Sequence, residues 1–556
     1  MRVEGMEVGV VNTMGTPIRQ GYFQINSVRH KVSMGQTYIS WEPEGTPDLR
    51  HLVPLSEVVA VSRPQPGRAA SAGSGAAVYR VPVREDGQLE QAAATCGRSF
   101  AVHYAERAGR RWKVRVQHFH QRSADTLRQW VDELHTLLQG FRRPQSLMVF
   151  INPACGRRRG PAIYKKKVKP IFALAGVQTE VIQTTHASHA SSLLQQCSLS
   201  GCDGVVVVGG DGTLMEVLNG LLKRQPDDQS PNAPVPIGVI PAGSTDAVCG
   251  SLQGSQDAVT AALHIVMGST RWVDVCSLRS GGRLLRYSLS MITYGFFGDL
   301  LKDSEKLLWL GPMRYNVAGA GRFWRSRAYR GSVAFRTAAG SLAPHKPCFA
   351  DCDVCCREPP PPPDAQTEPA EPTGEWHRVS GPFLVVSSAN VSCRCKITPA
   401  GMCPRAHLSD GWAHLILVRK TSRANFLRYM YRSAAGKDPF DLPFVEYYRV
   451  KEFELLPEVV GDGHRLLWET HVNSALSVDS AAAGDWPAAD PEVAVVPPAA
   501  GDARDSVWNC DGEVVAQPRI NLRVHPRAVR MFGRGVERVE ERGCCGGCGG
   551  RAKKHI

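Results

Sequence analysis

The chain has 556 residues, 43% of them hydrophobic, which is enough for two or three domains that each bury a core. Its net charge of +14 favours an anionic partner. Aromatic residues are only 7% and no nucleic-acid-binding motif is present, so we expect the partner to be a lipid surface and not a nucleic acid. The 17 cysteines are too sparse in a chain of this length for a disulfide scaffold. Without a secretory signal or a run of about 18 apolar residues, we expect a cytoplasmic protein with reduced thiols and no transmembrane helix.

The first 142 residues differ from the rest of the chain. Short β-type runs alternate with turns at 39–41, 58–61, 100–104 and 112–119, and a small-residue loop spans 67–77. A helix is predicted from its N-cap, Ser123, to Phe141, with an apolar stripe of Leu127, Trp130, Val131, Leu134, Leu137 and Leu138. Strands closed by a helix with a Trp at its middle resemble a pleckstrin-homology domain. That resemblance implies that residues 1–142 bind anionic phosphoinositide membranes.

Three buried strands follow, and each ends in a turn of small and polar residues. They lie in segments 147–156, 205–213 and 237–246, which are separated by helix-length stretches. The four consecutive valines from Val205 to Val208 are typical of a strand that is buried on both faces. This alternation predicts one parallel sheet over residues 144–290, with a ligand crevice at its carboxyl edge.

The turn at 209–213, Gly-Gly-Asp-Gly-Thr, carries the strongest chemical signal. It joins a strand to a helix whose apolar positions are Leu214, Val217, Leu218 and Leu221. A glycine turn before a helix directs backbone N–H groups at an anion and lets phosphate approach the backbone. Asp211 would repel phosphate, so we expect it to act through a metal ion or to take a proton from a nucleophile. Alternatively, Asp211 only hydrogen-bonds its own turn.

The part at 291–535 is expected to be rich in β-structure. Strand-like runs, the first of which begins slightly earlier, lie at 284–290, 331–335, 383–387 and 415–419. They suit an antiparallel sandwich that completes a lipid cleft. Two inserts, near 357–375 and 465–505, are rich in Pro, Ala and acidic residues and are expected to be disordered, as is the tail at 536–556.

Several of these segments together resemble a known family. Asn152-Pro153 with Gly156, the glycine turn with Glu216, and residues 241–246 (Pro-Ala-Gly-Ser-Thr-Asp) look like the diacylglycerol-kinase-type catalytic domain of lipid kinases. Residues 294–306 and 508–513, the latter Trp-Asn-Cys-Asp-Gly-Glu, narrow the resemblance to the ceramide kinases, from about residue 144 to the end. Asp246 stands where most of the superfamily carries Asn, and ceramide kinases share that Asp.

Together, the two resemblances imply a pleckstrin-homology-like domain followed by a two-domain lipid kinase, with an α/β nucleotide-binding domain and a β-sandwich C-terminal domain, so that the fold class is α/β plus β. The resemblance to ceramide kinases carries the implied activity. It implies transfer of the γ-phosphate of ATP, with Mg²⁺, to the primary hydroxyl of ceramide, with Ca²⁺ as an activator. It also implies peripheral association with Golgi and plasma membranes. The alternatives are a sphingosine or diacylglycerol kinase on the same fold, or a catalytically silent lipid-binding relative. A basic helix at 422–432 suits calmodulin or a membrane surface, or it is a core helix with basic outer positions.

The site residues are carried over from the resemblance, motif by motif. Nucleotide contacts are implied at Asn152, Pro153, Ala154, Cys155, Gly156, Thr185, His186, Ala187, Ser188, Glu216, Gly243, Ser244, Thr245, Lys306, Arg314, Asp511, Gly512 and Glu513. Substrate contacts are implied at Gly209, Gly210, Asp211, Gly212 and Asp299. Asp211 is the expected general base, with Glu513 as its rival or partner, and Asp511 or Glu513 is expected to hold Mg²⁺ through water. Lys306 and Arg314 neutralise phosphate charge or form surface ion pairs.

A cysteine cluster at Cys348, Cys352 and Cys355, with Cys356 adjacent, permits a metal site. Its spacing differs from a pair of Cys-x2-Cys units, and His345 is the candidate fourth ligand. The alternative is a set of reduced, partly buried thiols. In either case we expect the cluster to support the structure.

Overall fold

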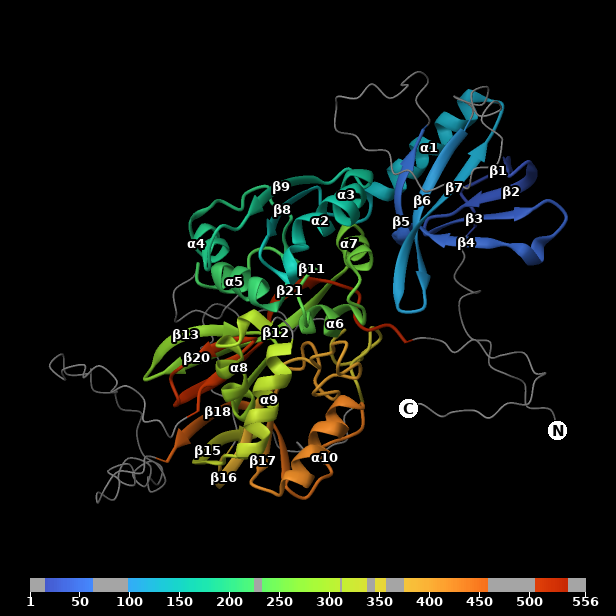
Figure 1. Ribbon diagram of the computed structural model, residues 1–556. Helices are drawn as coiled ribbons and strands as arrows, with labels where there is room; N and C mark the ends of the chain where they lie inside the picture. The colour runs from blue at the N-terminus through green and yellow to red at the C-terminus, as the bar shows by residue number, and fades with distance from the viewer. Residues whose placement is uncertain are drawn as a thin grey trace, which may run out of the picture.

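The computed structural model describes residues 16–63, 99–224, 233–310, 313–337, 346–356, 375–458 and 506–538. The loop predicted at 67–77, the insert at 465–505 and the tail beyond residue 538 lie outside these residues, as does all but residue 375 of the insert at 357–375. Figure 1 shows three parts: an N-terminal module, an α/β part beside it, and a β-rich part that follows. Within the described residues, no helix combines the length and apolar character that crossing a membrane requires.

The N-terminal module is an antiparallel sheet closed by one helix. Its strands are β1 (Arg19–Ile25), β2 (Val28–Met34), β3 (Tyr38–Pro43), β4 (His51–Pro54), β5 (Val58–Ser62), β6 (Ser99–Ala108) and β7 (Arg111–His120), in the order β4-β3-β2-β1-β7-β6-β5. Short 3-10 turns, η2 (Pro47–Leu49) and η3 (Leu55–Glu57), flank β4. Helix α1 (Ala124–Gln139) begins where the sequence predicts, because Ser123 Oγ accepts the N–H of Thr126 at 3.2 Å. Its Trp130 packs edge-on against Phe23, at 5.0 Å between ring centroids.

This module packs against the α/β part. Trp112 of β7 is only 4% exposed; its backbone N–H donates to Thr260 Oγ1 at 3.0 Å, and its indole N–H donates to Glu537 at 2.8 Å. Val59 and Ala105 join the same apolar cluster. Trp112 therefore attaches the module to a helix of the neighbouring part and to the segment that follows the last strand.

The α/β part is a parallel sheet with helices on both faces. The strands are β8 (Ser146–Ile151), β9 (Gln178–Gln183), β10 (Gly204–Gly209) and β11 (Ile237–Pro241), in the order β9-β8-β10-β11. The helices are η4 (Gly156–Arg158), α2 (Gly160–Ile163), η5 (Tyr164–Val168), α3 (Lys169–Leu174), α4 (His189–Gln196), α5 (Asp211–Leu222), α6 (Ala247–Gln253) and α7 (Ala258–Val266). Val205 and Val207 pack with α4 and α5, whereas Val206 and Val208 pack with α3 and α7. The predicted strand with two buried faces is confirmed.

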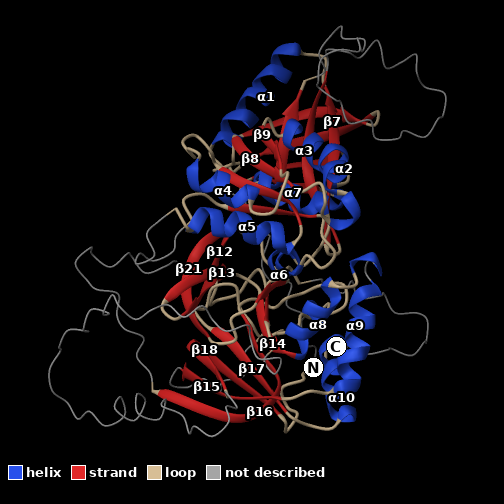
Figure 2. Cartoon of the chain, turned by 60° about the vertical axis from the view of Figure 1, so that its left-hand side comes forward, coloured by secondary structure: helices blue, strands red, loops and turns tan. Residues whose placement is uncertain are grey.

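The β-rich part is mainly antiparallel. Its strands are β12 (Thr270–Ser280), β13 (Arg283–Ser288), β14 (Met291–Gly295), β15 (Tyr329–Thr337), β16 (Trp376–Ala389), β17 (Ala413–Arg419), β18 (Val445–Pro457), β19 (Trp508–Cys510), β20 (Glu513–Val515) and β21 (Ile520–Phe532). Its helices are α8 (Phe296–Glu305), η6 (Leu308–Leu310), α9 (Met313–Arg325) and α10 (Arg423–Ala434). One core lies among the strands, and a second lies between the sheet and helices α8 and α10, which Figure 2 shows along one side.

Strand β21 joins the two parts into one sheet. It pairs in parallel with β11, through Ile237 and Met531, and antiparallel with β12 and β18. The sheet therefore runs through both parts as a mixed sheet, and the domain boundary at residue 290 stays a prediction. The pair joins the amino end of β11 to the carboxyl end of β21.

Candidate active site

The turns after β8, β10 and β11 meet at the carboxyl edge of the parallel strands. A Cβ built on Gly156 would lie 1.6 Å from the carbonyl oxygen of Ala242, and Gly156 has a positive φ of 54°. A Cβ on Gly210 would lie 3.1 Å from the Cα of Gly243. These contacts leave no room for side chains, so glycine is required where the three turns touch.

Asn152 ties the first turn to helix α5. Its side-chain Nδ2 donates to Thr213 Oγ1 at 2.9 Å, while its side-chain Oδ1 accepts the N–H of Ala154 at 2.9 Å. Pro153 and Ala154 follow at the surface, and burial raises the pKa of the Cys155 thiol. The Cys155 thiol is therefore neutral, and its contact with nucleotide stays a prediction.

Asp211 is the first residue of α5, and its carboxylate caps helix α6. Its oxygens accept the backbone N–H groups of Ala247 at 3.0 Å and Val248 at 3.2 Å. Burial raises the pKa of Asp211, and the nearby charge of Asp511 raises it further, although the two N–H donors oppose the shift. The expected alternative, a bond within its own turn, is not the arrangement found.

Asp246, at the N-cap of α6, has a left-handed backbone with φ 50°. Its Oδ1 accepts the N–H of Gly243 at 2.9 Å. Burial, followed by the charge of Asp211, raises the pKa of Asp246 to about 7. A protonated Asp offers one acceptor and one donor, as Asn does.

The turn between β19 and β20 brings two more carboxylates to this edge. Asp511, with φ 52°, accepts the N–H groups of Ser290 at 2.8 Å and Met291 at 3.2 Å through Oδ1. Its Oδ2 is buried and has no hydrogen-bond partner among the described residues. Gly512 has a φ of 91° and donates its N–H to Asn509 at 2.9 Å, which closes the turn.

Glu513 lies beside Gly212 of the glycine turn at 209–213. One carboxylate oxygen lies 3.7 Å from the position that a Cβ on Gly212 would occupy, and the other accepts from Arg286 at 2.7 Å. Arg286 was not predicted from the sequence, because a single Arg in a strand has no motif that marks it. The two acidic segments, far apart in the chain, thus share one site.

Glu216 connects the site to the segment after β9. Burial raises the pKa of Glu216, which accepts backbone N–H groups of Ser188 and Ala190, and the charge of Glu513 raises it too. Segment 185–188 therefore lies at the same edge; in it, the N–H of Thr185 donates to His189. Ser244 and Thr245 are exposed in the turn before α6. The nucleotide roles of these residues stay predictions.

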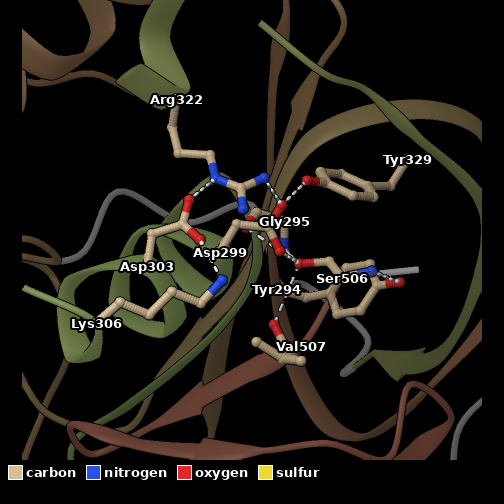
Figure 3. Close-up of polar contacts among 9 residues, drawn as sticks. All are labelled: Tyr294, Gly295, Asp299, Asp303, Lys306, Arg322, Tyr329, Ser506 and Val507. Carbon is tan, nitrogen blue, oxygen red and sulfur yellow. Dashed lines mark hydrogen bonds and ion pairs between the residues drawn. The ribbon is translucent and has the colours of Figure 1, made fainter. Parts of the chain in front are cut away.

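Asp299 lies at the centre of a buried cluster rather than in open solvent (Figure 3). It accepts from Arg322 of α9 at 2.8 Å and from Ser506 Oγ at 2.7 Å, and it contacts the Tyr329 hydroxyl. Asp299 therefore holds α8 against α9 and against the segment that leads into β19. Burial and this carboxylate both raise the pKa of Tyr329.

Lys306 and Arg314 make contacts away from the glycine turns. Lys306 is 3.8 Å from Asp303 and its side chain is largely exposed, while Arg314 donates to the Tyr315 hydroxyl at 2.6 Å. For Lys306, this is the surface ion pair that the sequence left open. Contact of either side chain with phosphate stays a prediction.

The basic helix predicted at 422–432 is α10, capped by Ser422. Phe426 and Tyr429 are only 3% and 5% exposed and pack in the core beside α8. Calmodulin would have to draw both from the core, at about 1.5–3 kcal/mol for each large apolar side chain. This arrangement matches the alternative of a core helix with basic outer positions.

Two family models match the chain. The diacylglycerol kinase catalytic domain matches residues 146–278, and the ceramide kinase C-terminal domain matches residues 355–548. The first match covers the parallel sheet and its glycine turns, and the second covers the strands that return Asp511 and Glu513. This fold and site define a lipid kinase of the diacylglycerol kinase type, which transfers phosphate to an alcohol.

Individual relatives narrow the class. Ceramide kinase of Homo sapiens is 41% identical over 460 residues, covering 79% of this chain and 83% of that protein. Ceramide kinase-like protein of Homo sapiens is 30% identical, covering 74% and 73%. Sphingosine kinase 1 of Arabidopsis thaliana is 32% identical, covering 61% and 70%. A putative diacylglycerol kinase from Bacillus anthracis str. Sterne has a TM-score of 0.45 at 15% identity, covering 70% of this chain and 95% of that one. The chain belongs to the ceramide kinase family.

Proposed function

We propose that this chain transfers the γ-phosphate of ATP to the primary hydroxyl of ceramide, giving ceramide 1-phosphate. The observation that carries the proposal is the meeting of three glycine turns with the acidic turn at 511–513. Phosphoryl transfer needs positioning and charge stabilisation more than covalent chemistry, and this edge offers both.

The nucleotide phosphates are proposed to lie over the turns at 152–156 and 243–245. Both turns contain glycines that let the backbones of the turns lie close together, and helix α5 directs its N-terminus at the same edge. Mg²⁺ fits beside Asp511, whose buried Oδ2 has no donor among the described residues. Carboxylate oxygens are the ligands that Mg²⁺ prefers, and a bound Mg²⁺ would neutralise phosphate charge.

Asp211 is proposed as the general base that accepts the proton of the ceramide hydroxyl. Two backbone donors fix its carboxylate, and its raised pKa brings it closer to the working pH, which strengthens a base. Glu513 is tied to Arg286, and its side chain is 47% exposed, which suits a role beside the metal or nucleotide. A loose transition state requires little base strength, so a late proton transfer to Asp211 suffices.

The lipid is proposed to enter beside α8 and α9. Asp299 holds these helices together, so it positions the substrate site in addition to any direct contact with the lipid. Trp309, Met313, Val317 and Trp324 expose apolar surface along η6 and α9, and Trp309 is 80% exposed. Such side chains suit a membrane interface, where a lipid kinase meets its substrate.

The N-terminal module is proposed to be a pleckstrin-homology-like domain that binds anionic phosphoinositides. Its antiparallel strands followed by α1 support this, as does the net positive charge of the chain. The exposed Arg29 and the nearby Lys31 lie on β2. In vesicle sedimentation of the full chain, Arg29→Glu with Lys31→Glu should weaken phosphoinositide-dependent binding, whereas Arg128→Glu on α1 should not. Equal binding by both variants would argue against this role.

The experiment for the main proposal is a kinase assay on the purified full chain with γ-labelled ATP and Mg²⁺. Ceramide, sphingosine and diacylglycerol are offered in the same mixed micelles. Preferential labelling of ceramide is expected. Preferential labelling of sphingosine or diacylglycerol would show that ceramide is not the main substrate. The absence of label in all three lipids would favour a catalytically silent lipid-binding protein.

A further inference from the structure

Three cysteines and one histidine converge at a point away from the glycine turns. Cys348, Cys352 and Cys355 lie in segment 346–356, between β15 and β16, and His407 lies in the loop between β16 and β17. One ligand atom from each lies within 4.8 Å of all the others. We propose that these four side chains bind a structural zinc ion.

Three of the separations lie close to those of a tetrahedral site, and all of them are within 4.8 Å. With Zn–S near 2.3 Å and Zn–N near 2.0 Å, neighbouring ligand atoms should lie about 3.5–3.8 Å apart. The sulfurs of Cys348 and Cys355 are 3.6 Å apart, and His407 Nδ1 is 3.2 Å from Cys352 Sγ and 3.8 Å from Cys355 Sγ. A disulfide would need sulfurs about 2.0 Å apart, so the cluster is not a disulfide.

The surroundings orient the ligands as they do in known metal sites. His407 Nε2 lies 3.1 Å from the carbonyl oxygen of Lys346, so this nitrogen carries the proton and Nδ1 presents its lone pair to the sulfurs. Backbone N–H groups of Leu408 and Ser409 bond to Cys348 and Cys355. Hydrogen bonds of this kind hold ligand sulfurs in a fixed orientation around a metal ion.

The neighbouring thiol shows a different environment. Cys356 is exposed, and its sulfur contacts Arg271 at 2.8 Å instead of the cluster. Cys352, by contrast, is only partly buried, which leaves an entry path for the ion. The candidate fourth ligand from the sequence, His345, lies outside the described residues. His407 was missed because it is 52 residues from Cys355, with no spacing signature to connect them.

A bound zinc ion would connect segment 346–356 to the loop between β16 and β17. Segment 346–356 is bonded to the segment that follows β21, where Ala350 N–H donates to the carbonyl of Val536 at 2.9 Å. The loop that carries His407 also contains Arg394, whose N–H donates to Ser251 Oγ of α6 at 3.1 Å. Helix α6 is the helix that Asp211 caps. The zinc is therefore a positioning element, distinct from the Mg²⁺ that accompanies ATP.

Metal analysis of the full chain, purified under reducing conditions without chelator, tests the site. About one zinc per chain is expected. His407→Ala should weaken zinc binding by at least about tenfold in competition with a chromogenic chelator. His407→Cys should restore it as a four-thiolate site, and Cys356→Ser should bind as the wild type does. Cobalt in place of zinc should give the visible bands of tetrahedral thiolate coordination, and these should be lost in His407→Ala.

Two results would overturn the proposal. One is a chain that is folded and reduced by thiol titration but takes up no zinc or cobalt. The other is unchanged zinc affinity in His407→Ala. Because these readouts measure metal and not turnover, they stand apart from the substrate assay. If His407→Ala fails to fold, cobalt titration of the folded wild type still decides between a metal site and free thiols.

Discussion

Asp246→Asn should change how stability depends on pH. In the folded chain the pKa of Asp246 is about 7, raised from 3.8 by burial and by Asp211. A raised carboxyl pKa means that the folded state keeps a proton that the unfolded state releases. This contribution to stability is fully present below about pH 4 and is lost as the pH rises to about 7. Asn keeps the acceptor for Gly243 N–H and carries no titrating group, so it removes this dependence.

The magnitude follows from the pKa difference. A shift of about 3 units corresponds to roughly 4 kcal/mol as an upper limit, at about 1.4 kcal/mol per pH unit. The free energy of unfolding of Asp246→Asn relative to wild type should therefore rise between pH 5 and 7 and level off above about 7. Above pH 7 the wild type carries an ionised Asp246 beside Asp211, and this negative charge should weaken ATP binding. The KM of the wild type for ATP should therefore rise above pH 7 more than the KM of Asp246→Asn does.

Denaturant midpoints of both proteins, measured from pH 5 to 8.5, provide the assay. Asp132→Asn, which removes an exposed carboxylate on α1, is the matched control for the loss of one charge. A difference between Asp246→Asn and wild type that stays flat over this range would refute the reasoning, because it would mean that Asp246 is already ionised in the folded chain at pH 5.

Three further outcomes are expected. Glu513→Gln should lose its ion pair with Arg286 and raise KM for ATP more than it lowers kcat; an equal effect of Arg286→Met on KM would support this, and an unchanged KM would contradict it. Gly156→Ala should abolish nucleotide binding, because its Cβ would meet the Ala242 carbonyl at 1.6 Å, whereas Gly109→Ala, in an open turn, should not; nucleotide fluorescence titration distinguishes them. Asp511→Asn should raise the Mg²⁺ concentration needed for half-maximal turnover by at least about tenfold, while thermal unfolding still shows a folded chain. An unchanged Mg²⁺ titration would contradict the assignment of the metal to Asp511.

Local sequence patterns accounted for the elements that depend on near neighbours. The buried strand at Val205–Val208 and helix α1 were predictable because apolar spacing and an N-cap are written in adjacent residues. The glycine turns were predictable because close backbone contact excludes every other residue. Chain-order reasoning could not show that β21 joins both parts into one sheet, since strand pairing between residues 237 and 531 leaves no periodic signal.

The site shows the same limit. Asp211 and Glu513 could be named from their motifs, but their partners Val248 and Arg286 come from elements whose placement depends on the whole fold. Asp299 could be assigned to the substrate side by resemblance, yet its bonds to Arg322 and Ser506 depend on a helix and a strand that meet only in three dimensions. His407 likewise joins the cysteines across two loops.

The most direct measurement of the central claim compares wild type and Asp211→Asn in the transfer of label from γ-labelled ATP to ceramide. The wild type should form ceramide 1-phosphate, and the variant should turn over about 10²–10⁴-fold more slowly with its fold intact by circular dichroism, because the group that receives the hydroxyl proton is gone. Equal rates in the two proteins would contradict the claim and would move the proton acceptor away from Asp211.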